Sequence, residues 1–216
     1  MEIIDQKLRE QLAGKFSKEL KGEVRIWLFT SKKKESCEYC DTVTKIVNEI
    51  CSINDKLKLF VYDIDDHQKE AKVLGVEMTP AILLQGAIAS RIYYYGMPTG
   101  YEFSSLVEDL IDISQSKSRL SNAAKEIIRE IDKEIEIKVF VTPTCPYCPA
   151  AVRMAHQAAL ENTNIKASMI EAMEFSELSG RYGVMGVPKI VINDHISFEG
   201  AVPEETFISY VKQAAE

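Results

Sequence analysis

The sequence has no excess of basic residues. Its 26 Lys and Arg residues are outnumbered by 33 Asp and Glu residues, which gives the chain a net charge of −7. Proteins that bind nucleic acid or anionic membrane surfaces usually carry a basic patch that matches the phosphate groups. The charge balance therefore argues against both kinds of partner.

Long apolar runs are also missing. No stretch approaches the ~18 apolar residues that a membrane-spanning helix needs, and Asp5, Lys7, Arg9 and Glu10 interrupt any apolar core of an export signal. We therefore expect a soluble, cytoplasmic protein. Apolar residues still make up 46% of the 216 residues, which predicts packed cores and allows two domains, and the 27% of charged residues is compatible with a thermophilic source.

Cysteine is scarce, but its positions form a pattern. Four of the five cysteines form two C-x-x-C pairs, C-E-Y-C at 37–40 and C-P-Y-C at 145–148. Stable disulfides are rare in cytosolic proteins, where cysteine pairs are usually catalytic or transient, with hyperthermophiles as an exception. The pairs are therefore candidates for redox sites, metal sites or structural disulfides.

An offset of 108 residues relates the two pairs and other parts of the sequence, which predicts an internal repeat. Each motif begins 43 residues before a proline that opens an apolar strand. Later in each half the offset falls to 104, so the second copy lacks four residues, which we place in the hairpin between Leu84 and Ile92. The matching positions are Asp63 and Glu171, Gly75 and Gly183, Val76 and Val184, Pro80 and Pro188, Gly96 and Gly200, and Phe103 and Phe207.

Both halves predict the same order of elements: helix, strand, long helix, strand, short helix, strand, strand, helix. The segments VRIWLFT (24–30) and IEIKVFVT (135–142) are rich in β-branched and aromatic residues, as strands are. Apolar residues recur with helical spacing in 8–20, in 127–131 and in 207–211. The pattern predicts the α/β fold class.

The polar stretch 113–122 predicts the junction between the two copies, near residue 116. We therefore expect two domains, residues 1–116 with C-E-Y-C and residues 117–216 with C-P-Y-C. Each has about 100 residues, which is enough for one core.

A C-x-x-C pair behind a strand and at the start of a helix has a specific chemistry. Pro146 suits the first helical position, because its φ is fixed and its missing N–H would have no partner there. Cys145 would then cap the helix, where free N–H groups and the helix dipole lower the pKa of a thiol. Cys148, one turn later, can resolve the mixed disulfide that Cys145 forms with a substrate.

In the first motif, Cys37 is the expected attacking cysteine and Cys40 the resolving cysteine. Glu38 replaces the proline, so we expect a different thiolate pKa and a different reduction potential at this site. Tyr39 and Tyr147 occupy matching places in the two motifs. Contact with a docked substrate and packing against the neighbouring loop are both open for them.

The segments that follow each motif resemble a known family. YGVMGVPKIVI (182–192) and GAVPEETF (200–207) look like the second half of a thioredoxin, and C-P-Y-C is typical of glutaredoxins. The resemblance implies cis prolines at Pro80 and Pro188 that face the cysteines. It also implies that the backbone of Thr79 and Val187 pairs with a substrate peptide.

Two such units in one chain are similar to the protein disulfide oxidoreductases of thermophilic archaea and bacteria. The resemblance implies two tandem thioredoxin-like folds, each with a central mixed sheet flanked by helices. It also implies reduction, formation or isomerisation of protein disulfides, with electrons from NADPH through a thioredoxin reductase and no bound cofactor. The W-C-G-P-C of thioredoxins is absent, and Glu199-Gly200 stands where glutaredoxins carry a Gly-Gly pair that binds glutathione. Protein or peptide substrates therefore fit better than glutathione.

Other functions stay open at this point. Four thiolates could bind zinc, but zinc ribbons usually separate their pairs by ~15–20 residues, whereas 104 residues separate these pairs. Inert structural disulfides are a further alternative. The chain could also be a dedicated electron-transfer module for a peroxidase-type partner, or a zinc-stabilised or chaperone-like scaffold that binds peptides.

The remaining candidate residues favour structural roles. Cys51 maps onto a small apolar residue, Ala159, and is expected in a core. Lys32, Lys33 and Lys34 precede the first pair and could lower its thiolate pKa, although a solvated loop is the simpler interpretation. The three histidines, His67, His156 and His195, share no spacing with the cysteines and are expected to be neither bases nor metal ligands.

Overall fold

The computed structural model describes residues 3–33 and 37–216, and it contains two copies of one order of elements. The order in each half is the one that the sequence predicts. No helix in the described ranges is long and apolar enough to cross a membrane. The first copy consists of α1 (Gln6–Glu19), β1 (Val24–Thr30), α2 (Cys40–Cys51), β2 (Leu57–Asp63), α3 (Gln68–Val73), β3 (Ala81–Gln85), β4 (Arg91–Tyr95) and α4 (Glu102–Gln115), and the second of α5 (Asn122–Arg129), β5 (Ile135–Val141), α6 (Cys148–Glu161), β6 (Ile165–Glu171), α7 (Ser176–Arg181), β7 (Lys189–Ile192), β8 (Ile196–Glu199) and α8 (Glu204–Ala215).

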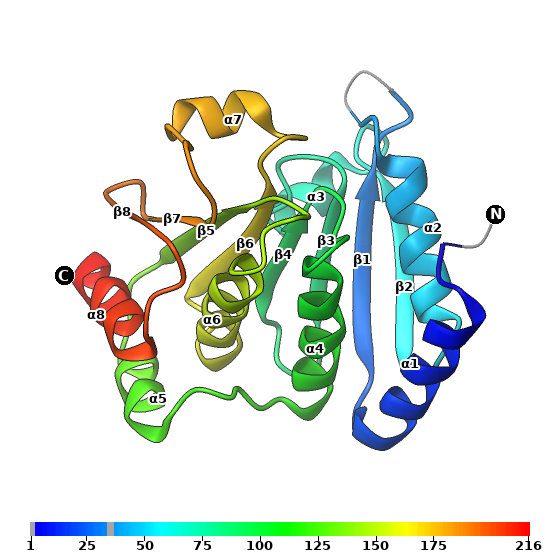
Figure 1. Cartoon of the computed structure of the whole chain (residues 1–216), viewed down its shortest axis with the longest axis horizontal. Coiled ribbons are helices and arrows are strands. Elements are labelled where there is room, and N and C mark those ends of the chain that lie inside the picture. The colour runs from blue at the N-terminus through cyan, green and yellow to red at the C-terminus, as the bar shows by residue number, and fades with distance from the viewer. Residues whose placement is uncertain (1–2, 34–36) are drawn as a thin grey trace.

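All eight strands form one mixed sheet in the order β2-β1-β3-β4-β6-β5-β7-β8. Within each half, the first two strands are parallel and the later neighbours are antiparallel. A parallel pair of β4 and β6 joins the halves, from Arg91 opposite Lys166 to Tyr95 opposite Ile170. The two expected units therefore share one sheet, and α1 and α8 lie at opposite ends of the molecule (Figure 1).

Side chains alternate between the two faces of this sheet, as the pleat of a strand requires. Ile82, Leu84 and Tyr94 belong to a core on one face, whereas Leu83 and Tyr93 belong to a second core on the other face. The long helices of both halves pack on the first core, and α3 and α7 pack on the second. The first core runs through both halves without a break, so burial of apolar surface also holds the two units together.

The internal repeat is visible in the hairpins. The β3–β4 hairpin spans residues 81–95 and the β7–β8 hairpin spans residues 189–199, so the second is four residues shorter. The missing residues therefore lie where the sequence places them. Between the two copies, α4 ends at Gln115 and is capped by Ser116, which has a φ of 51°. Ser121 caps α5 by accepting a hydrogen bond from the N–H of Ala124 at 3.2 Å. The domain boundary near residue 116 stays a prediction.

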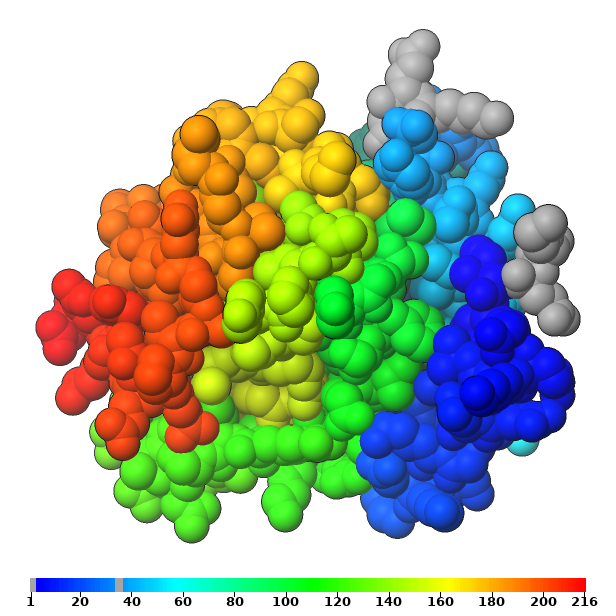
Figure 2. All heavy atoms as spheres, viewed as in Figure 1, coloured from blue at the N-terminus to red at the C-terminus, as the bar shows by residue number. Residues whose placement is uncertain are grey.

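A buried polar cluster connects α4 of the first unit with α6 of the second. Asp109 accepts hydrogen bonds from the hydroxyl of Tyr94 and from Nδ1 of His156, the latter at 2.6 Å, and it forms an ion pair with Arg153. Arg153 also pairs with Asp112. Asp109 is 1% exposed and His156 is fully buried. The two helices lie side by side at the centre of the molecule (Figure 2).

This cluster explains a histidine whose role the sequence does not reveal. Burial lowers the pKa of His156 to about 3, so the ring is neutral and donates through Nδ1 to Asp109. The histidine thus has a structural place in a buried cluster. Its place between the units was not predicted, because an isolated histidine on a helix carries no spacing signal.

We expect Asp109→Ala to destabilise the chain by about 3–5 kcal/mol, because it leaves the buried Arg153 guanidinium with one partner fewer and the Tyr94 hydroxyl without its acceptor. Guanidinium chloride unfolding, followed by the fluorescence of the single tryptophan, measures the loss. The exposed Asp132→Ala serves as the matched control. A loss within 0.5 kcal/mol of that control, roughly the spread of surface substitutions, would show that the cluster does not hold the units together.

Candidate redox sites

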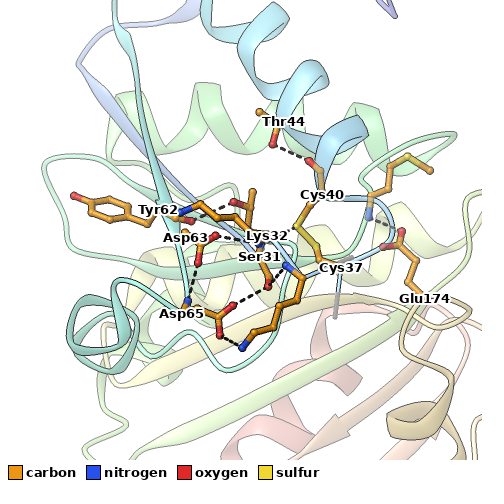
Figure 3. The surroundings of a disulfide bond; sticks show 12 residues. Ser31, Lys32, Cys37, Cys40, Thr44, Tyr62, Asp63, Asp65 and Glu174 are labelled. Carbon is orange, nitrogen blue, oxygen red and sulfur yellow. Dashed lines mark hydrogen bonds and ion pairs between the residues drawn. A yellow bond between two sulfur atoms is a disulfide. The ribbon is translucent and has the colours of Figure 1, made fainter. Parts of the chain in front are cut away.

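Cys37 and Cys40 form a disulfide at the start of α2 in the first unit, with their Cα atoms 5.3 Å apart. Cys40 is the first helical residue, and both cysteines are at most 6% exposed. The Sγ atom of Cys40 also accepts a hydrogen bond from the backbone N–H of Ser31 at 3.3 Å. The first pair is therefore held between the end of β1 and the start of α2 (Figure 3).

Two lysines that precede this pair have carboxylate partners. Lys32 pairs with Asp66 at 2.7 Å and Lys33 with Asp65 at 2.8 Å. Both pairs are exposed to solvent, which favours the interpretation of a solvated, charged loop. Surface ion pairs of this kind contribute little to stability. Lys34 lies outside the described residues.

Thr79 and Pro80 are joined by a cis peptide bond, as the resemblance implies. The carbonyl of Pro80 accepts a hydrogen bond from the N–H of Gly96 at 3.0 Å, which ties the cis-proline loop to the end of β4. A cavity of about 580 Å³ brings Thr79 and Pro80 together with Cys37 and Tyr39. The structure thus gathers all the predicted residues of the first site except Cys40 around one opening. Their roles in catalysis and substrate binding stay predictions.

Cys145 and Cys148 form the second disulfide, with their Cα atoms 5.5 Å apart. The prediction that the helix starts at Pro146 with Cys145 as its cap is wrong: Pro146 and Tyr147 form a turn, and α6 begins at Cys148. Pro149 takes the place in the first turn that the sequence assigns to Pro146. The Sγ atom of Cys145 still accepts a hydrogen bond from the N–H of Cys148 at 3.1 Å, so it contacts a free N–H of the helix start.

The second cis peptide bond joins Val187 and Pro188, again as the resemblance implies. Val187 packs against the core that contains Cys145 and Cys148, and the carbonyl of Pro188 accepts from Gly200 at 2.8 Å. The surroundings of this site are open, because Tyr147 is 70% exposed and Met185 is 92% exposed. The second site therefore offers an accessible apolar surface.

The two glycines that pair with the cis prolines reveal how the sites differ. A Cβ atom on Gly96 would lie 2.7 Å from Cβ of Glu171 and 3.1 Å from Oε2 of Glu174, whereas nothing lies within 4 Å of one on Gly200. Because β6 pairs with β4, the turn between β6 and α7 covers the first site. No element of the described chain covers the second site at the matching position.

Two glutamates from the second unit therefore line the cavity over Cys37. Glu174 accepts a hydrogen bond from the N–H of Met97 at 2.7 Å and donates its own N–H to Glu171 at 2.6 Å. Burial, with repulsion from Glu171 and Glu38, raises the pKa of Glu174 to about 7. Figure 3 shows Glu174 approaching the Cys37–Cys40 disulfide from a separate segment of chain.

A third glutamate lies beside the loop that leads to the second pair. The N–H of Tyr101 donates to the carbonyl of Pro143 at 3.1 Å, and the next residue, Glu102, is 1% exposed. Burial raises the pKa of Glu102 to about 7. Sequence reasoning missed Glu102 and Glu174, since both read as ordinary acidic residues in polar segments. Only Glu171 carried a signal, through its match with Asp63.

The fifth cysteine stands apart from both sites. Cys51 lies at the end of α2 and packs, partly buried, against the core, and burial raises the pKa of its thiol to about 12. It is therefore a weak nucleophile. Among residues 3–33 and 37–216, no group of three or more His, Cys, Asp and Glu side chains is placed to hold a metal ion.

Comparison with known proteins identifies the same units. A sequence profile of the thioredoxin domain family matches residues 26–108 and 135–212. The crystal structure of a protein disulfide oxidoreductase from Aeropyrum pernix K1 superimposes with a TM-score of 0.91 and 31% identity, covering 98% of this chain and 94% of that one.

Curated relatives match one unit or both. A thioredoxin from Methanocaldococcus jannaschii is 36% identical over 81 residues, which are 37% of this chain and 95% of that protein. An alkyl hydroperoxide reductase subunit of Escherichia coli K12 is 26% identical over 200 residues, covering 88% of this chain. The chain spans only 38% of the length of that relative.

The raised pKa of Glu102 predicts a pH-dependent stability. The folded chain holds a proton on this carboxyl group up to about pH 7, whereas the unfolded chain releases it near pH 4.5. The stabilisation is therefore complete below about pH 4.5 and is lost as the pH rises through about 7. Glu102→Gln, which is neutral at every pH, should unfold with a free energy higher by on the order of 1–3 kcal/mol at pH 8 and unchanged at pH 4.5.

Denaturant unfolding at the two pH values compares Glu102→Gln with the unsubstituted chain. Glu126→Gln, an exposed glutamate on α5, is the matched control and should change the free energy of unfolding at neither pH. A gain of equal size at both pH values would mean that packing, and not the charge of Glu102, is responsible.

Proposed function

Because the chain belongs to the thioredoxin domain family, we propose that it is a protein thiol-disulfide oxidoreductase that works through two C-x-x-C sites. One observation carries this proposal: each motif forms a disulfide at the start of a helix, in a unit that also contains a cis-proline loop. The 31% identical protein disulfide oxidoreductase that matches along 98% of the chain supports it. The clients are proteins or peptides that contain disulfides.

In a reduction, the thiolate of Cys37 or Cys145 attacks one sulfur of a client disulfide, and the other client sulfur leaves as a thiolate that takes up a proton. Chain and client are then joined by a mixed disulfide. The thiolate of Cys40 or Cys148 attacks the sulfur of its own motif partner, which re-forms the internal disulfide and releases the second client thiol. Two electrons thus pass to the client. Oxidation reverses these steps, and isomerisation uses the mixed disulfide as its intermediate.

The cis-proline loops position the client in this proposal. An extended client segment hydrogen-bonds to the backbone of Thr79 at the first site or of Val187 at the second. The adjoining Pro80 and Pro188 hold these backbone groups toward the cysteines. At the motifs themselves, Tyr39, Tyr147 and Pro146 contact the segment that carries the client cysteine.

The two sites differ enough to suggest a division of labour. Glu38 and the glutamates of the β6–α7 turn surround the first pair, whereas Pro146 and open surface surround the second. Negative charge disfavours a thiolate, so it raises the pKa of the attacking thiol and changes the potential of the pair. We propose that one site chiefly reduces or oxidises clients, and that the other isomerises disulfides or relays electrons.

Electrons reach the chain from NADPH through a thioredoxin reductase-like partner in the cytoplasm, and the chain itself binds no cofactor, under this proposal. A second candidate is a dedicated electron-transfer module for a peroxidase-type partner. It is favoured by the match of 88% of the chain to part of an alkyl hydroperoxide reductase. Broad reduction of insulin would argue against such a dedicated role.

Separate Cys37→Ser and Cys145→Ser variants test the two sites. In the reduction of insulin by dithiothreitol, each single variant should lose part of the catalysed rate, and the double variant should fall to the rate of dithiothreitol alone, because no attacking thiolate remains. In the refolding of scrambled ribonuclease, the two single variants should rank differently from their ranking with insulin.

The control is Cys51→Ser, which removes a thiol outside both motifs and should keep the full rate of insulin reduction. Equal losses for the two single variants in every assay would contradict the division of labour. Full activity of the double variant would contradict the proposed function.

A further inference from the structure

The charged side chains described in the lining of the cavity over Cys37 are all negative. Three carboxylates line it, from Glu38, Glu171 and Glu174, and none of the described residues that line it is Lys, Arg or His. The cavity has a volume of about 580 Å³, within the range of ligand pockets in proteins. Such a cleft attracts cations, because walls of one sign concentrate the field inside it.

The carboxylates are held in place by the backbone. Oε1 of Glu174 accepts the N–H of Met97, and Oε2 of Glu171 accepts the N–H of Glu174. The remaining oxygen of each group is buried and has no hydrogen-bond partner among the described residues, and Glu171 as a whole is only 3% exposed. A buried carboxylate without a cation costs free energy. The described residues of the first site therefore supply no cation to these carboxylates.

The second site has no comparable set of carboxylates. Pro146 stands where the first motif has Glu38, and open space surrounds Gly200 where Gly96 meets Glu171 and Glu174. Beside the second cis-proline loop, Glu199 approaches Gly186, but its side chain is exposed. Solvent therefore screens its charge.

We propose that the first site selects client disulfides whose cysteine is flanked by lysine or arginine. The client cation enters the cavity and lies against Glu174 and Glu38, while the negative charge of the buried Glu171 also attracts it. Met97, Met173 and Phe175 also line the cavity and offer apolar surface to the stem of the cationic side chain. This inference rests on the proposed function and names the client class of one of its two sites.

The test uses peptides that differ by one charge. Three otherwise identical peptides carry Arg, Gln or Glu beside a cysteine in mixed disulfide with 2-nitro-5-thiobenzoate, whose release is followed by absorbance. The first site is isolated in a Cys145→Ser/Cys148→Ser chain and the second in a Cys37→Ser/Cys40→Ser chain. At low salt and pH 8, above the pKa of about 7 of Glu174, the first site should release the chromophore from the Arg peptide at least about tenfold faster than from the Glu peptide. Added salt should shrink this preference. At the second site the peptides should react at similar rates.

Substitutions that remove the charge of Glu171 or Glu174 test whether these carboxylates cause the preference for the Arg peptide. In the chain with only the first site, Glu171→Gln and Glu174→Gln should each reduce the ratio of the Arg to the Glu rate, because glutamine keeps a carbonyl acceptor but loses the charge. Glu177→Gln is the matched control, an exposed acidic residue on α7 outside the cavity lining, and should keep the ratio.

The outcomes distinguish failure of the cation preference from failure of the proposed function. Equal rates for the three peptides at a working first site would overturn the cation preference and leave the proposed function standing. A preference that survives both glutamine substitutions would overturn its assignment to Glu171 and Glu174. Failure of both single-site chains to release the chromophore from any peptide would overturn the proposed function together with this inference.

Discussion

The parallel pairing of β4 with β6 decides how the two redox sites differ. It joins two four-stranded sheets edge to edge, so the second unit follows the first along one continuous sheet. The turn after β6 then lies against the cis-proline loop of the first unit, while the corresponding surface of the second unit has no further neighbour in the described chain. Two units with the same order of elements therefore have unlike environments at their redox sites, one covered and acidic, the other open and apolar.

Carboxylates are buried at two contacts between the units. They are paired with a cation at one contact and not at the other. Between α4 and α6, Asp109 and Asp112 meet the guanidinium of Arg153, so charges that would be costly alone are paired. Beside Cys37, Glu171 is buried and Glu174 half-buried, and no Lys, Arg or His of the described chain lines their cavity. Pairing in the first place holds the units together. Such pairing is absent from the described residues in the second place, beside the Cys37–Cys40 disulfide, and there we propose that a client docks.

Sequence reasoning predicted the features that repeat. The order of elements, the shortened second hairpin and the family resemblance follow from an offset that can be read directly, and the cis peptide bonds at Pro80 and Pro188 follow from the resemblance. The start of α6 was misplaced because Pro146 and Pro149 both suit a first helical turn, and the chain uses the second.

The contacts between the units could not be predicted in the same way. Any of the edge strands could have joined the two sheets, or none, because a strand pattern does not name its partner in another unit. The positions of Glu102, Glu174 and His156 depend on this pairing, so their burial and altered pKa values have no signature in the sequence.

Site-resolved redox titration tests the central claim most directly. The purified chain is equilibrated in defined dithiol buffers, and alkylation with peptide mass analysis reports each pair separately. Both pairs should titrate between about −270 and −120 mV, with Cys37–Cys40 at the more negative potential, because the surrounding carboxylates disfavour its thiolate. Pairs that resist reduction below about −300 mV, or that react with the alkylating agent only after zinc is removed, would contradict the account.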